Sequence, residues 1–454
     1  LQLGNGERRL GRKALGIKVG LLGLGTVGTG TAEILLDPQD RHPLVAKIEL
    51  ARVGVRNLDK PRQVQIPAEC LTTDLESIVK DPDIDIVVEV IGGLEPARTL
   101  ILTAIRQGKH VVTANKAVIA RYGDEIFTAA NEAGVYVLLE AAVGGGIPVI
   151  QPLKQALGVN RIHAVTGIIN GTTNYILTRM MREGGDFEPI LADAQRLGYA
   201  EADPTADVDG LDAADKIAIL ASLAFGGRIK LSDVYSEGIR HVTAADIAYA
   251  QQLGFVIKLL AIARRDVCPV SQEQLEELQL RVHPTLVPQS HPLASIHDVY
   301  NAILVEGTPI GQVMFFGPGA GAGPTASAVV SDVLNIAATL ISGQGLDAVP
   351  KNPNPLLACT HQHYCKVSPM ADIVSRFYLR LVAEDQPGVI GKLGQCFGDH
   401  EVSLESVVQI GMQDHRAEIV VVSHEVKEAN CQKALDELRE FPEIHSVASV
   451  LRVL

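Results

Sequence analysis

Residues 17–36 read IKVGLLGLGTVGTGTAEILL and decide the fold expected for the first part of the chain. An apolar run, a Gly23-x-Gly25-x-x-Gly28 turn and a helix-forming run follow one another. The glycines permit a tight turn, close approach of the backbone to a pyrophosphate and close helix packing, and the helix N-terminus offers N–H donors to phosphates. The stretch therefore predicts a strand, a dinucleotide-binding loop and a helix.

The next apolar run, residues 48–55, ends in Arg56-Asn57. At this strand end, dinucleotide-binding folds often carry an acidic residue that accepts hydrogen bonds from the adenosine ribose. An arginine can hold the 2′-phosphate instead. Arg56 therefore favours NADP, with NAD as the alternative cofactor.

Strand-like and helix-like runs then alternate: IDIVVEV (84–90), a helix over 95–107, HVVTANK (110–116), a helix over 117–132 and VYVLLEAAV (135–143). This order predicts an α/β fold with a Rossmann-type, doubly wound, mainly parallel sheet. Ligands bind at the carboxyl ends of the strands in such sheets. We therefore expect Gly92-Gly93 and Asn115-Lys116 near the nicotinamide, with Lys116 as a second cation.

Two glycine-rich stretches frame the middle of the chain. Residues 140–148, EAAVGGGIP, expose backbone carbonyls beside one carboxylate, which fits a domain hinge and, as the alternative, a bound cation. Residues 317–340 form a second glycine-rich turn that opens a helix, and we expect this segment to return to the dinucleotide domain with Gly321 against the cofactor. Between them, residues 150–316 predict an inserted α+β substrate and dimerisation domain.

Within that domain, residues 198–216 read GYAEADPTADVDGLDAADK and concentrate six carboxylates ahead of one lysine. If residues 210–225 are one helix, Asp212 and Lys216 are four apart and share a face, with Asp212 near the positive helix N-terminus. In an isolated stretch the spacing favours a solvated acidic turn with a surface ion pair. The alternative, which the context of the stretch strengthens, is a pair that points into a cleft. A calcium loop is excluded, because its twelfth position would fall on Lys216.

The rest of the chain predicts a polar arm at residues 1–16, a linker at 341–373 and a ferredoxin-like βαββαβ domain at 374–454. The dinucleotide domain would then span 17–149 and be completed by 317–340. The linker contains Cys359, His361, His363 and Cys365. On one face of an extended strand these four side chains could not easily surround a single tetrahedral ion, which argues against zinc.

The composition argues against several classes of protein. A net charge of −13 disfavours sequence-independent nucleic-acid binding, which uses clustered Lys and Arg. Apolar runs are interrupted before the roughly 18 residues of a membrane span, and residues 1–16 lack a signal-peptide core. Six irregularly spaced cysteines do not suggest a disulfide framework. We expect a cytoplasmic protein with reduced thiols and no nucleic-acid or membrane partner.

From residue 17 to residue 454 the chain resembles the homoserine dehydrogenases. The shared motifs are GLGTVG (23–28), TANK (113–116), EAAVGGGIP (140–148), INGTTNYI (169–176), GYAEADPTADVDGLDAADK (198–216) and GPGAGAGPTASAVVSD (317–332). The resemblance implies NAD(P)H-dependent reduction of L-aspartate 4-semialdehyde to L-homoserine, in the aspartate pathway to threonine, methionine and isoleucine. With no kinase-like region ahead of the first motif, the chain is similar to the monofunctional form.

The resemblance also implies roles for individual residues. Lys216 would donate the proton to the substrate carbonyl, and Glu201 and Asp212 would bind the substrate. A sodium ion would lie at Glu140, Val143, Gly145 and Ile147. The positions that we expect at the cofactor are Gly23, Gly25, Thr26, Val27, Gly28, Arg56, Gly92, Lys116, Gly198 and Gly321.

The C-terminal domain resembles an ACT domain, with Asp385-Gln386-Pro387-Gly388 at the loop where such domains bind regulatory amino acids. The family implies threonine as the effector and a homodimer or homotetramer as the assembly. A phosphorylating semialdehyde dehydrogenase is a poorer interpretation, because its cysteine nucleophile has no counterpart between residues 71 and 267. A non-catalytic dinucleotide and amino-acid sensor remains the alternative.

Overall fold

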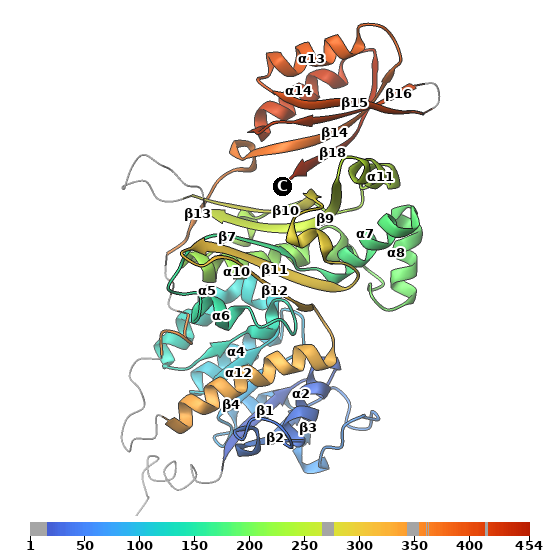
Figure 1. Cartoon of the computed structure of the whole chain (residues 1–454). Coiled ribbons are helices and arrows are strands. Elements are labelled where there is room, and N and C mark those ends of the chain that lie inside the picture. Colours follow the sequence, from blue (N-terminus) through green and yellow to red (C-terminus); the bar gives the residue numbers. More distant parts are fainter. Residues whose placement is uncertain (1–15, 266–276, 343–353, 360, 362, 414–415) are drawn as a thin grey trace, which may run out of the picture. The chain divides into compact units, whose positions relative to one another are not determined.

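The structure, a computed structural model, describes residues 16–265, 277–342, 354–359, 361, 363–413 and 416–454 (Figure 1). Residues 1–15 of the predicted arm lie outside the described residues. The chain forms two compact units, each assembled from several stretches of sequence. Unit 1 combines the residues up to Arg161 with 219–230 and 315–364, and unit 2 combines 162–218, 231–314 and 365–454. The domain boundaries given above stay predictions.

Unit 1 is built on a parallel sheet with the strand order β3-β2-β1-β4-β5-β6. Its strands are β1 (Ile17–Leu22), β2 (Ile48–Gly54), β3 (Leu71–Thr72), β4 (Ile86–Glu89), β5 (His110–Thr113) and β6 (Val137–Leu138). In the central strand β1, Val19, Leu21 and Leu22 are fully buried. Parallel strands that are covered on both faces need such continuous apolar runs. The predicted Rossmann-type sheet is confirmed.

The helices of unit 1 are α2 (Thr26–Leu36), α3 (Leu75–Lys80), α4 (Ala97–Arg106), α5 (Lys116–Ala133), α6 (Ile150–Lys154) and α12 (Ala322–Ser342). Although α12 is far from α2 in sequence, the two helices pack against each other. A Cβ atom on Gly30 would lie 2.8 Å from the Ala322 carbonyl oxygen, so glycine allows the close approach. Val329, Val333 and Ile336 of α12 are fully buried in the core of unit 1.

Among the described helices, α12 alone is long and apolar enough to cross a membrane, with a mean hydropathy of 1.4 over its apolar window. Half of that window is buried inside the structure. The helix also carries the fully buried carboxyl group of Asp332 in its middle. Core helices of globular domains pass the same test of length and composition.

The strand predicted over residues 135–143 was wrong in extent. Only Val137 and Leu138 pair with β5, and Glu140–Ala142 form a 3-10 turn. The turn places the Glu140 carboxylate at the start of α6, where it accepts backbone N–H groups from residues 149–151. This contact with a later segment competes with continuation of the strand.

Unit 2 contains a mixed sheet with the order β12-β11-β7-β9-β10-β18-β14-β16-β15. Its first part consists of β7 (Arg161–Ile168), β9 (Phe255–Arg265), β10 (Glu277–Pro288), β11 (Tyr300–Thr308) and β12 (Gly311–Pro318), with the short β8 (Tyr235–Ser236) and β13 (Lys366–Val367) beside β10. The helices are α7 (Gly171–Glu183), α8 (Phe187–Arg196), α9 (Thr205–Val208), α11 (Ala244–Gln252) and the first part, up to Ala218, of α10 (Leu211–Phe225). The α+β character predicted for residues 150–316 is confirmed.

The C-terminal subdomain of unit 2 has the predicted βαββαβ order. It consists of β14 (Val374–Glu384), α13 (Val389–Asp399), β15 (Leu404–Gln413), β16 (Arg416–Ser423), α14 (Glu428–Arg439) and β18 (Ile444–Val453), with the short β17 (Val426–Lys427) beside β14. Figure 1 shows α13 and α14 on one face of the sheet. Phe377, Phe397 and Leu435, from the sheet and from both helices, are fully buried between them.

The C-terminal subdomain continues the sheet of the preceding residues rather than standing apart from it. Strand β18 pairs in parallel with β10, Thr285 opposite Arg452 and Leu286 opposite Val453. Beside this joint, Arg380 of β14 lies 2.7 Å from the fully buried Asp246 of α11. Removing one partner of such a buried pair typically costs about 3–5 kcal/mol, because the other charge stays buried without compensation.

Candidate active site

The loop between β1 and α2 has the geometry that a dinucleotide pyrophosphate requires. Gly23 has φ 103°, and a Cβ atom on Gly28 would lie 2.1 Å from the Gly23 carbonyl oxygen, so only glycine fits at position 28. Gly25 is the N-cap of α2 and offers no side-chain cap, and a Cβ atom there would meet nothing within 4 Å. The first N–H groups of α2, at Thr26 and Val27, therefore face an open approach that suits a phosphate group.

The side chain of Arg56 is exposed just beyond β2. This strand is the neighbour of β1, with Gly54 opposite Leu22, and Gly23 N–H donates to the Gly54 carbonyl oxygen at 3.0 Å. Arg56 thus follows the strand end at which a Rossmann fold holds the adenosine ribose. A guanidinium here fits a 2′-phosphate better than a bare ribose.

Polar groups meet where β4 and β5 end. Glu89 is fully buried and accepts hydrogen bonds from the Thr113 hydroxyl at 2.6 Å and from Ile91 N–H at 3.0 Å. Burial raises the pKa of Glu89, and these hydrogen bonds oppose the rise. Asn115 caps α5 and donates to the Gly93 carbonyl oxygen at 2.7 Å. The structure therefore brings together the two strand-end pairs, 92–93 and 115–116, that were expected beside the nicotinamide.

The Glu140 carboxylate is buried, and backbone N–H groups donate hydrogen bonds to both of its oxygens. Its oxygens accept N–H groups of Val149, Ile150 and Gln151 at 2.6, 2.8 and 2.7 Å. Its own N–H donates to Asp332 at 2.7 Å. A cation at this turn would therefore depend on backbone carbonyl oxygens rather than on this carboxylate.

Gly145 packs directly on the second glycine-rich stretch. It has φ 58°, and a Cβ atom there would lie 2.4 Å from the Gly319 carbonyl oxygen. Gly321, with φ 126°, directly precedes α12, and its carbonyl oxygen accepts Thr325 N–H. The two glycine-rich loops thus form one tightly packed backbone surface in unit 1.

In unit 2, Asp212 and Lys216 lie one turn apart at the start of α10, as the i,i+4 spacing predicted. Lys216 Nζ donates to Asp212 Oδ2 at 2.6 Å and to the Ile169 carbonyl oxygen at 2.7 Å. The side chains are 11% and 9% exposed. This exposure contradicts the interpretation as a solvated surface pair. An ammonium that is held by two acceptors and largely removed from water has the properties of a positioned proton donor.

Asn170 organises this ammonium site and was missed in the sequence. Its side-chain amide donates to Asp212 at 2.8 Å and to Asp207 at 2.7 Å, while its oxygen accepts Thr173 N–H at the start of α7. Asn170 thus caps one helix and holds carboxylates from two others. An Asn ahead of the helical run GTTNYIL is a recognisable N-cap signal, but nothing local reveals its distant partners.

The structure places Glu201 and Gly198 in the exposed connection between α8 and α9. Gly198 has φ 78° and ends α8, which is a turn that glycine adopts without strain. The Glu201 carbonyl oxygen accepts a hydrogen bond from Gln195, and the connection is tied to α7 where the Thr172 hydroxyl donates to the Tyr199 carbonyl oxygen. Among the described residues, no contact joins the Glu201 carboxylate to Lys216.

The Cys/His run of the predicted linker lies partly among described residues. Cys359 Sγ is 3.6 Å from His361 Nδ1, and Arg228 binds the His361 carbonyl oxygen at 2.9 Å. Cys365 belongs to unit 2, whereas Cys359 and His361 belong to unit 1. The described part of the run thus pairs one thiol with one imidazole.

The loop between β14 and α13 forms a cavity of about 330 Å³. It is lined by residues 384–390 together with Gln409, Ala417 and Ile419 of β15 and β16. Gly388, with φ 94°, is the N-cap of α13 and offers no side-chain cap, so the helix N–H groups are available to an anionic ligand. The loop predicted to bind an effector thus lines a cavity.

Three family models match the chain. The model described as homoserine dehydrogenase matches residues 148–334, the model described as the NAD-binding domain of homoserine dehydrogenase matches residues 23–140, and the ACT domain model matches residues 377–443. The matched residues include the glycine loop of β1–α2, the Lys216 site and the cavity of the C-terminal subdomain.

Relatives and solved structures agree with these models. The chain is 66% identical to a homoserine dehydrogenase from Synechocystis sp., over 96% of this chain and 99% of that protein. The crystal structure of a homoserine dehydrogenase from Thiobacillus denitrificans matches with a TM-score of 0.85 at 41% identity, over 96% of this chain and 98% of that one. A hyperthermophilic archaeal homoserine dehydrogenase in complex with NADPH matches with a TM-score of 0.58 at 26% identity, over 71% and 98%.

Proposed function

This chain belongs to the homoserine dehydrogenase family, and from that premise we propose how its residues carry out the reaction. The family and its close relatives make the protein an oxidoreductase that acts on a CH–OH group and uses a nicotinamide dinucleotide. The proposal is that the chain interconverts L-aspartate 4-semialdehyde and L-homoserine with NADPH or NADH. The observation that carries it is the buried ammonium of Lys216, held by Asp212 and the Ile169 carbonyl oxygen.

Lys216 is the proton donor in this proposal. When bound, the reduced nicotinamide supplies the hydride that adds to the aldehyde carbon. The carbonyl oxygen becomes an alkoxide, which the ammonium stabilises and then protonates. Asp212 and Asn170 fix the direction of the ammonium, since both belong to the same hydrogen-bonded group. General acid catalysis of this kind contributes about 10² to 10⁴ in rate.

Substrate recognition would use the acidic stretch around α9. The substrate carries an α-ammonium group, which requires negative charge, and we assign that role to Glu201 and Asp212. The exposure of Glu201 is compatible with a carboxylate that first engages the substrate from solvent.

At the cofactor, we assign the pyrophosphate to Gly23, Gly25 and Gly28 with the N–H groups of Thr26 and Val27, and the 2′-phosphate to Arg56. Gly92, Lys116, Gly198 and Gly321 complete the proposed contacts. The exposed guanidinium after β2 supports NADPH, and the archaeal relative is described in complex with that cofactor. A sodium ion at the backbone carbonyl oxygens of Glu140, Val143, Gly145 and Ile147 is part of the same proposal.

Threonine is the proposed effector, bound in the cavity formed by residues 384–390. The uncapped start of α13 suits a carboxylate, and Asp385 suits an α-ammonium group. The pathway that this regulation would serve leads to threonine, methionine and isoleucine. The contacts of β14 with α11 and of β18 with β10 support this proposal, because they join the subdomain that holds the cavity to the rest of unit 2.

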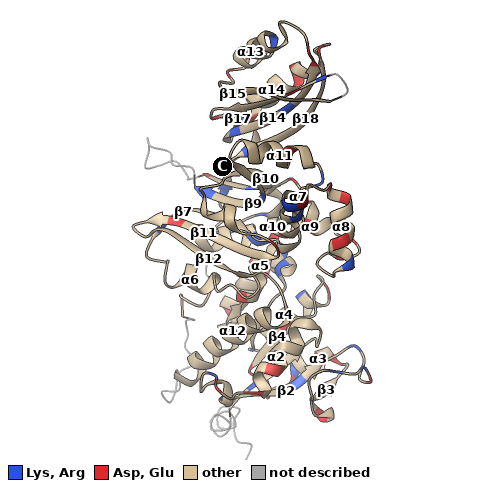
Figure 2. Ribbon diagram, turned by 45° about the vertical axis from the view of Figure 1, so that its right-hand side comes forward, with Lys and Arg blue, Asp and Glu red and all other residues tan. Residues whose placement is uncertain are grey.

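We also propose a cytoplasmic homodimer or homotetramer that binds small molecules only. Figure 2 shows basic and acidic positions interspersed along the ribbon, which supports small-molecule partners over nucleic acid. Along β15, at the end of the sheet, Val407, Val408 and Met412 are exposed. Exposed apolar residues on such an edge support pairing with a second copy.

The deciding experiment is an absorbance assay of NADP reduction by L-homoserine, repeated with NAD. The catalytic proposal expects steady formation of reduced cofactor that depends on both substrates. A non-catalytic sensor would bind the dinucleotide without consuming it, so binding without turnover in that assay would overturn the proposal.

A further inference from the structure

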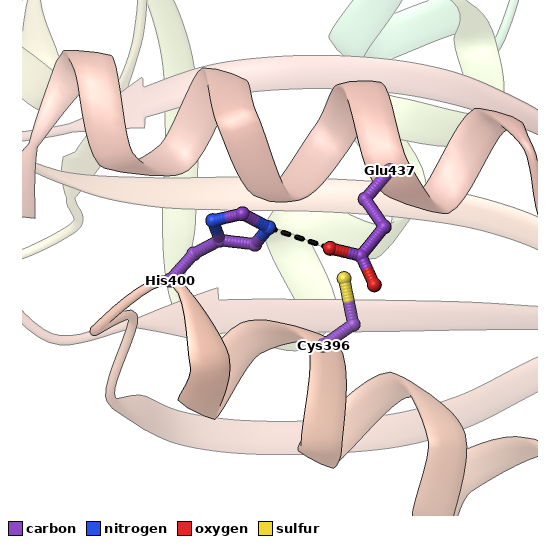
Figure 3. Close-up of side chains that lie close together, drawn as sticks. All are labelled: Cys396, His400 and Glu437. Atoms are coloured by element: carbon purple, nitrogen blue, oxygen red, sulfur yellow. Dashed lines mark hydrogen bonds and ion pairs between the residues drawn. The ribbon is translucent and has the colours of Figure 1, made fainter.

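Three metal-ligating side chains meet between α13 and α14 of the ACT domain (Figure 3). Cys396 lies on α13, His400 at the end of that helix, and Glu437 on α14. One ligand atom from each, a sulfur, a ring nitrogen and a carboxylate oxygen, lies within 4.8 Å of the other two. Within the described ranges, no other set of three His, Cys, Asp or Glu side chains is gathered so closely.

The positions of the three ligand atoms follow from the two helices. Cys396 and His400 are four residues apart, so they share the face of α13 that is turned toward α14. Figure 3 shows Glu437 reaching from the facing helix toward both of them. The helices pack on each other through the buried core of the domain, which fixes their separation. The cluster therefore has a rigid frame.

The three ligand atoms lie within the range from which a small rearrangement reaches the geometry of a tetrahedral zinc site. His400 Nε2 lies 2.7 Å from Glu437 Oε2. With metal–ligand distances of about 2.0–2.3 Å, neighbouring ligand atoms around tetrahedral zinc are roughly 3.3–3.6 Å apart. The Glu437 side chain is 45% exposed, so it has room for the rotation that opens its contact with His400.

Burial gives the cluster a closed side and an open side. Cys396 is 1% exposed, and the side chains of His400 and Glu437 are 24% and 45% exposed. A cation can therefore enter past Glu437 and reach a sulfur ligand that is shielded from solvent. One coordination position is left for water.

We propose that Cys396, His400 and Glu437 bind one zinc-type divalent cation between α13 and α14. The combination of thiolate, imidazole and carboxylate suits a borderline-soft ion such as Zn²⁺ better than Ca²⁺ or Mg²⁺, which prefer oxygen ligands.

Binding exchanges a proton for the metal. Burial, together with the negative charges of Glu437 and Asp399, raises the pKa of Cys396 to about 11. The thiol is thus protonated before the ion binds, and coordination releases that proton to solvent.

The site has a structural consequence for the effector cavity. α13 begins at Val389, directly after the loop of residues 385–388, and Cys396 lies two turns further along the same helix. An ion that joins α13 to α14 would restrain the helix whose N-terminus lines the cavity. The metal would therefore alter the response to an effector without touching the catalytic residues.

The competing interpretation is an ordinary His–Glu ion pair beside a buried thiol. In that case Cys396 serves packing, and its Sγ donates to the Ala434 carbonyl oxygen at 3.6 Å. The two interpretations differ in whether a sulfur–metal bond forms. Cobalt(II), which substitutes for zinc, reports that bond directly through a thiolate–cobalt absorption band in the near ultraviolet.

The test is a cobalt titration of the full chain after treatment with a chelator and in the presence of a phosphine reductant. We expect a thiolate–cobalt band that saturates at one equivalent and is abolished by zinc. Cys396→Ser should remove the band, and His400→Gln and Glu437→Gln should each weaken binding about tenfold or more. His400 is only partly buried and Glu437 is exposed, so we expect these two variants to fold, and they decide the matter if Cys396→Ser does not.

Two variants serve as matched controls. Cys431 is fully buried in the same domain but lies outside the cluster, and Cys359 belongs to the Cys/His run. Cys431→Ser and Cys359→Ser should keep the band and the affinity. Loss of the band in Cys359→Ser with retention in Cys396→Ser and His400→Gln would place the metal elsewhere and overturn the proposal. Absence of any thiolate–cobalt band in the unaltered protein would do the same.

Discussion

The Lys216 ammonium lies 2.6 Å from the Asp212 carboxylate that precedes it by one turn of α10. The Ile169 carbonyl oxygen accepts a second hydrogen bond from the same nitrogen, at 2.7 Å. With two of its three N–H directions fixed in this way, the ammonium offers its proton along a restricted direction. In the proposed reaction, one small hydrogen-bonded group would therefore both donate the proton and fix its direction.

Replacing Lys216 by alanine should lower turnover at least about a hundredfold and leave NADPH binding unchanged, as expected for the loss of a general acid. The measurements are steady-state turnover and cofactor fluorescence titration. Lys80→Ala is the control, because that lysine is exposed and paired with Glu76. Normal turnover in Lys216→Ala would contradict the assignment.

Two substitutions at Asn170 should separate its two roles. Asn170→Ala removes both the helix cap and the contacts with Asp207 and Asp212, so the free energy of unfolding should fall by about 1 kcal/mol and turnover by roughly tenfold. Asn170→Ser keeps a capping oxygen but is too short to hold both carboxylates. It should recover most of the stability while turnover stays low. Equal recovery of stability and turnover would show that Asn170 is only a cap.

Arg56→Ala should raise the Michaelis constant for NADPH about ten- to hundredfold, the usual effect of losing hydrogen bonds to a charged group. The constant for NADH should change less than about twofold. The neighbouring Arg62 donates to backbone carbonyl oxygens of Leu58 and Asn57, which makes Arg62→Ala a suitable control. Equal changes for both cofactors would remove Arg56 from the 2′-phosphate site.

The buried carboxyl group of Asp332 should make the protein less stable as the pH rises. Burial, with the charge of Glu140 as a further cause, raises the pKa of Asp332 to about 7, whereas an unfolded aspartate titrates near pH 4. Between these values the folded state holds the extra proton, so stability is full below about pH 4 and declines as the pH rises through 7. Burial also raises the pKa of Glu89 and of Glu140, which changes stability in the same direction.

For this reason the test compares the unaltered protein with Asp332→Asn, whose amide oxygen can still accept Glu140 N–H. Denaturant unfolding at pH 5.5 and pH 8 should show a smaller loss of stability in Asp332→Asn. An identical pH dependence in both proteins would mean that Asp332 titrates normally.

Asp385→Ala should abolish inhibition by threonine and leave the uninhibited turnover unchanged, if the cavity at residues 384–390 binds the effector. Asp436→Ala, on the exposed side of α14 and paired with Arg439, is the control and should stay sensitive. Threonine that still inhibits Asp385→Ala in competition with homoserine would place the inhibitor in the active site. Coupling of this kind usually amounts to about 1–3 kcal/mol, a change of roughly five- to 150-fold in affinity.

Local patterns in the sequence were sufficient for the α/β order of unit 1 and for the Lys216 pair. The Gly-x-Gly-x-x-Gly turn between an apolar run and a helical run fixes β1 and α2, and four-residue spacing fixes the relation of Asp212 to Lys216. Both features depend on residues that are close together in the chain. The physical constraints that define them are therefore visible in a single short stretch.

Features that depend on contacts between distant segments of the chain were not predicted from the sequence. Asn170 donates hydrogen bonds to Asp207 and Asp212, which lie 37 and 42 positions further along the chain, and no local sequence pattern predicts such partners. The strand predicted at 135–143 stops after Leu138 because Glu140 finds donors at residues 149–151. The pairing of β18 with β10 occupies two residues on each strand, and periodicity alone does not identify which edges meet.

The interleaved course of the chain through its two units has a consequence for protein synthesis. On the ribosome β10 emerges long before β18, and at about 5–20 residues per second the interval is roughly eight to thirty seconds. During that time residues 285 and 286 cannot pair with β18, and Asp246 cannot form its ion pair with Arg380, because these later segments have not yet been synthesised. Unit 1 meets a similar delay, because its core needs α12. Neither unit can therefore complete its sheet and core before most of the chain has been made, and until then the strand edges of the nascent protein stay unpaired.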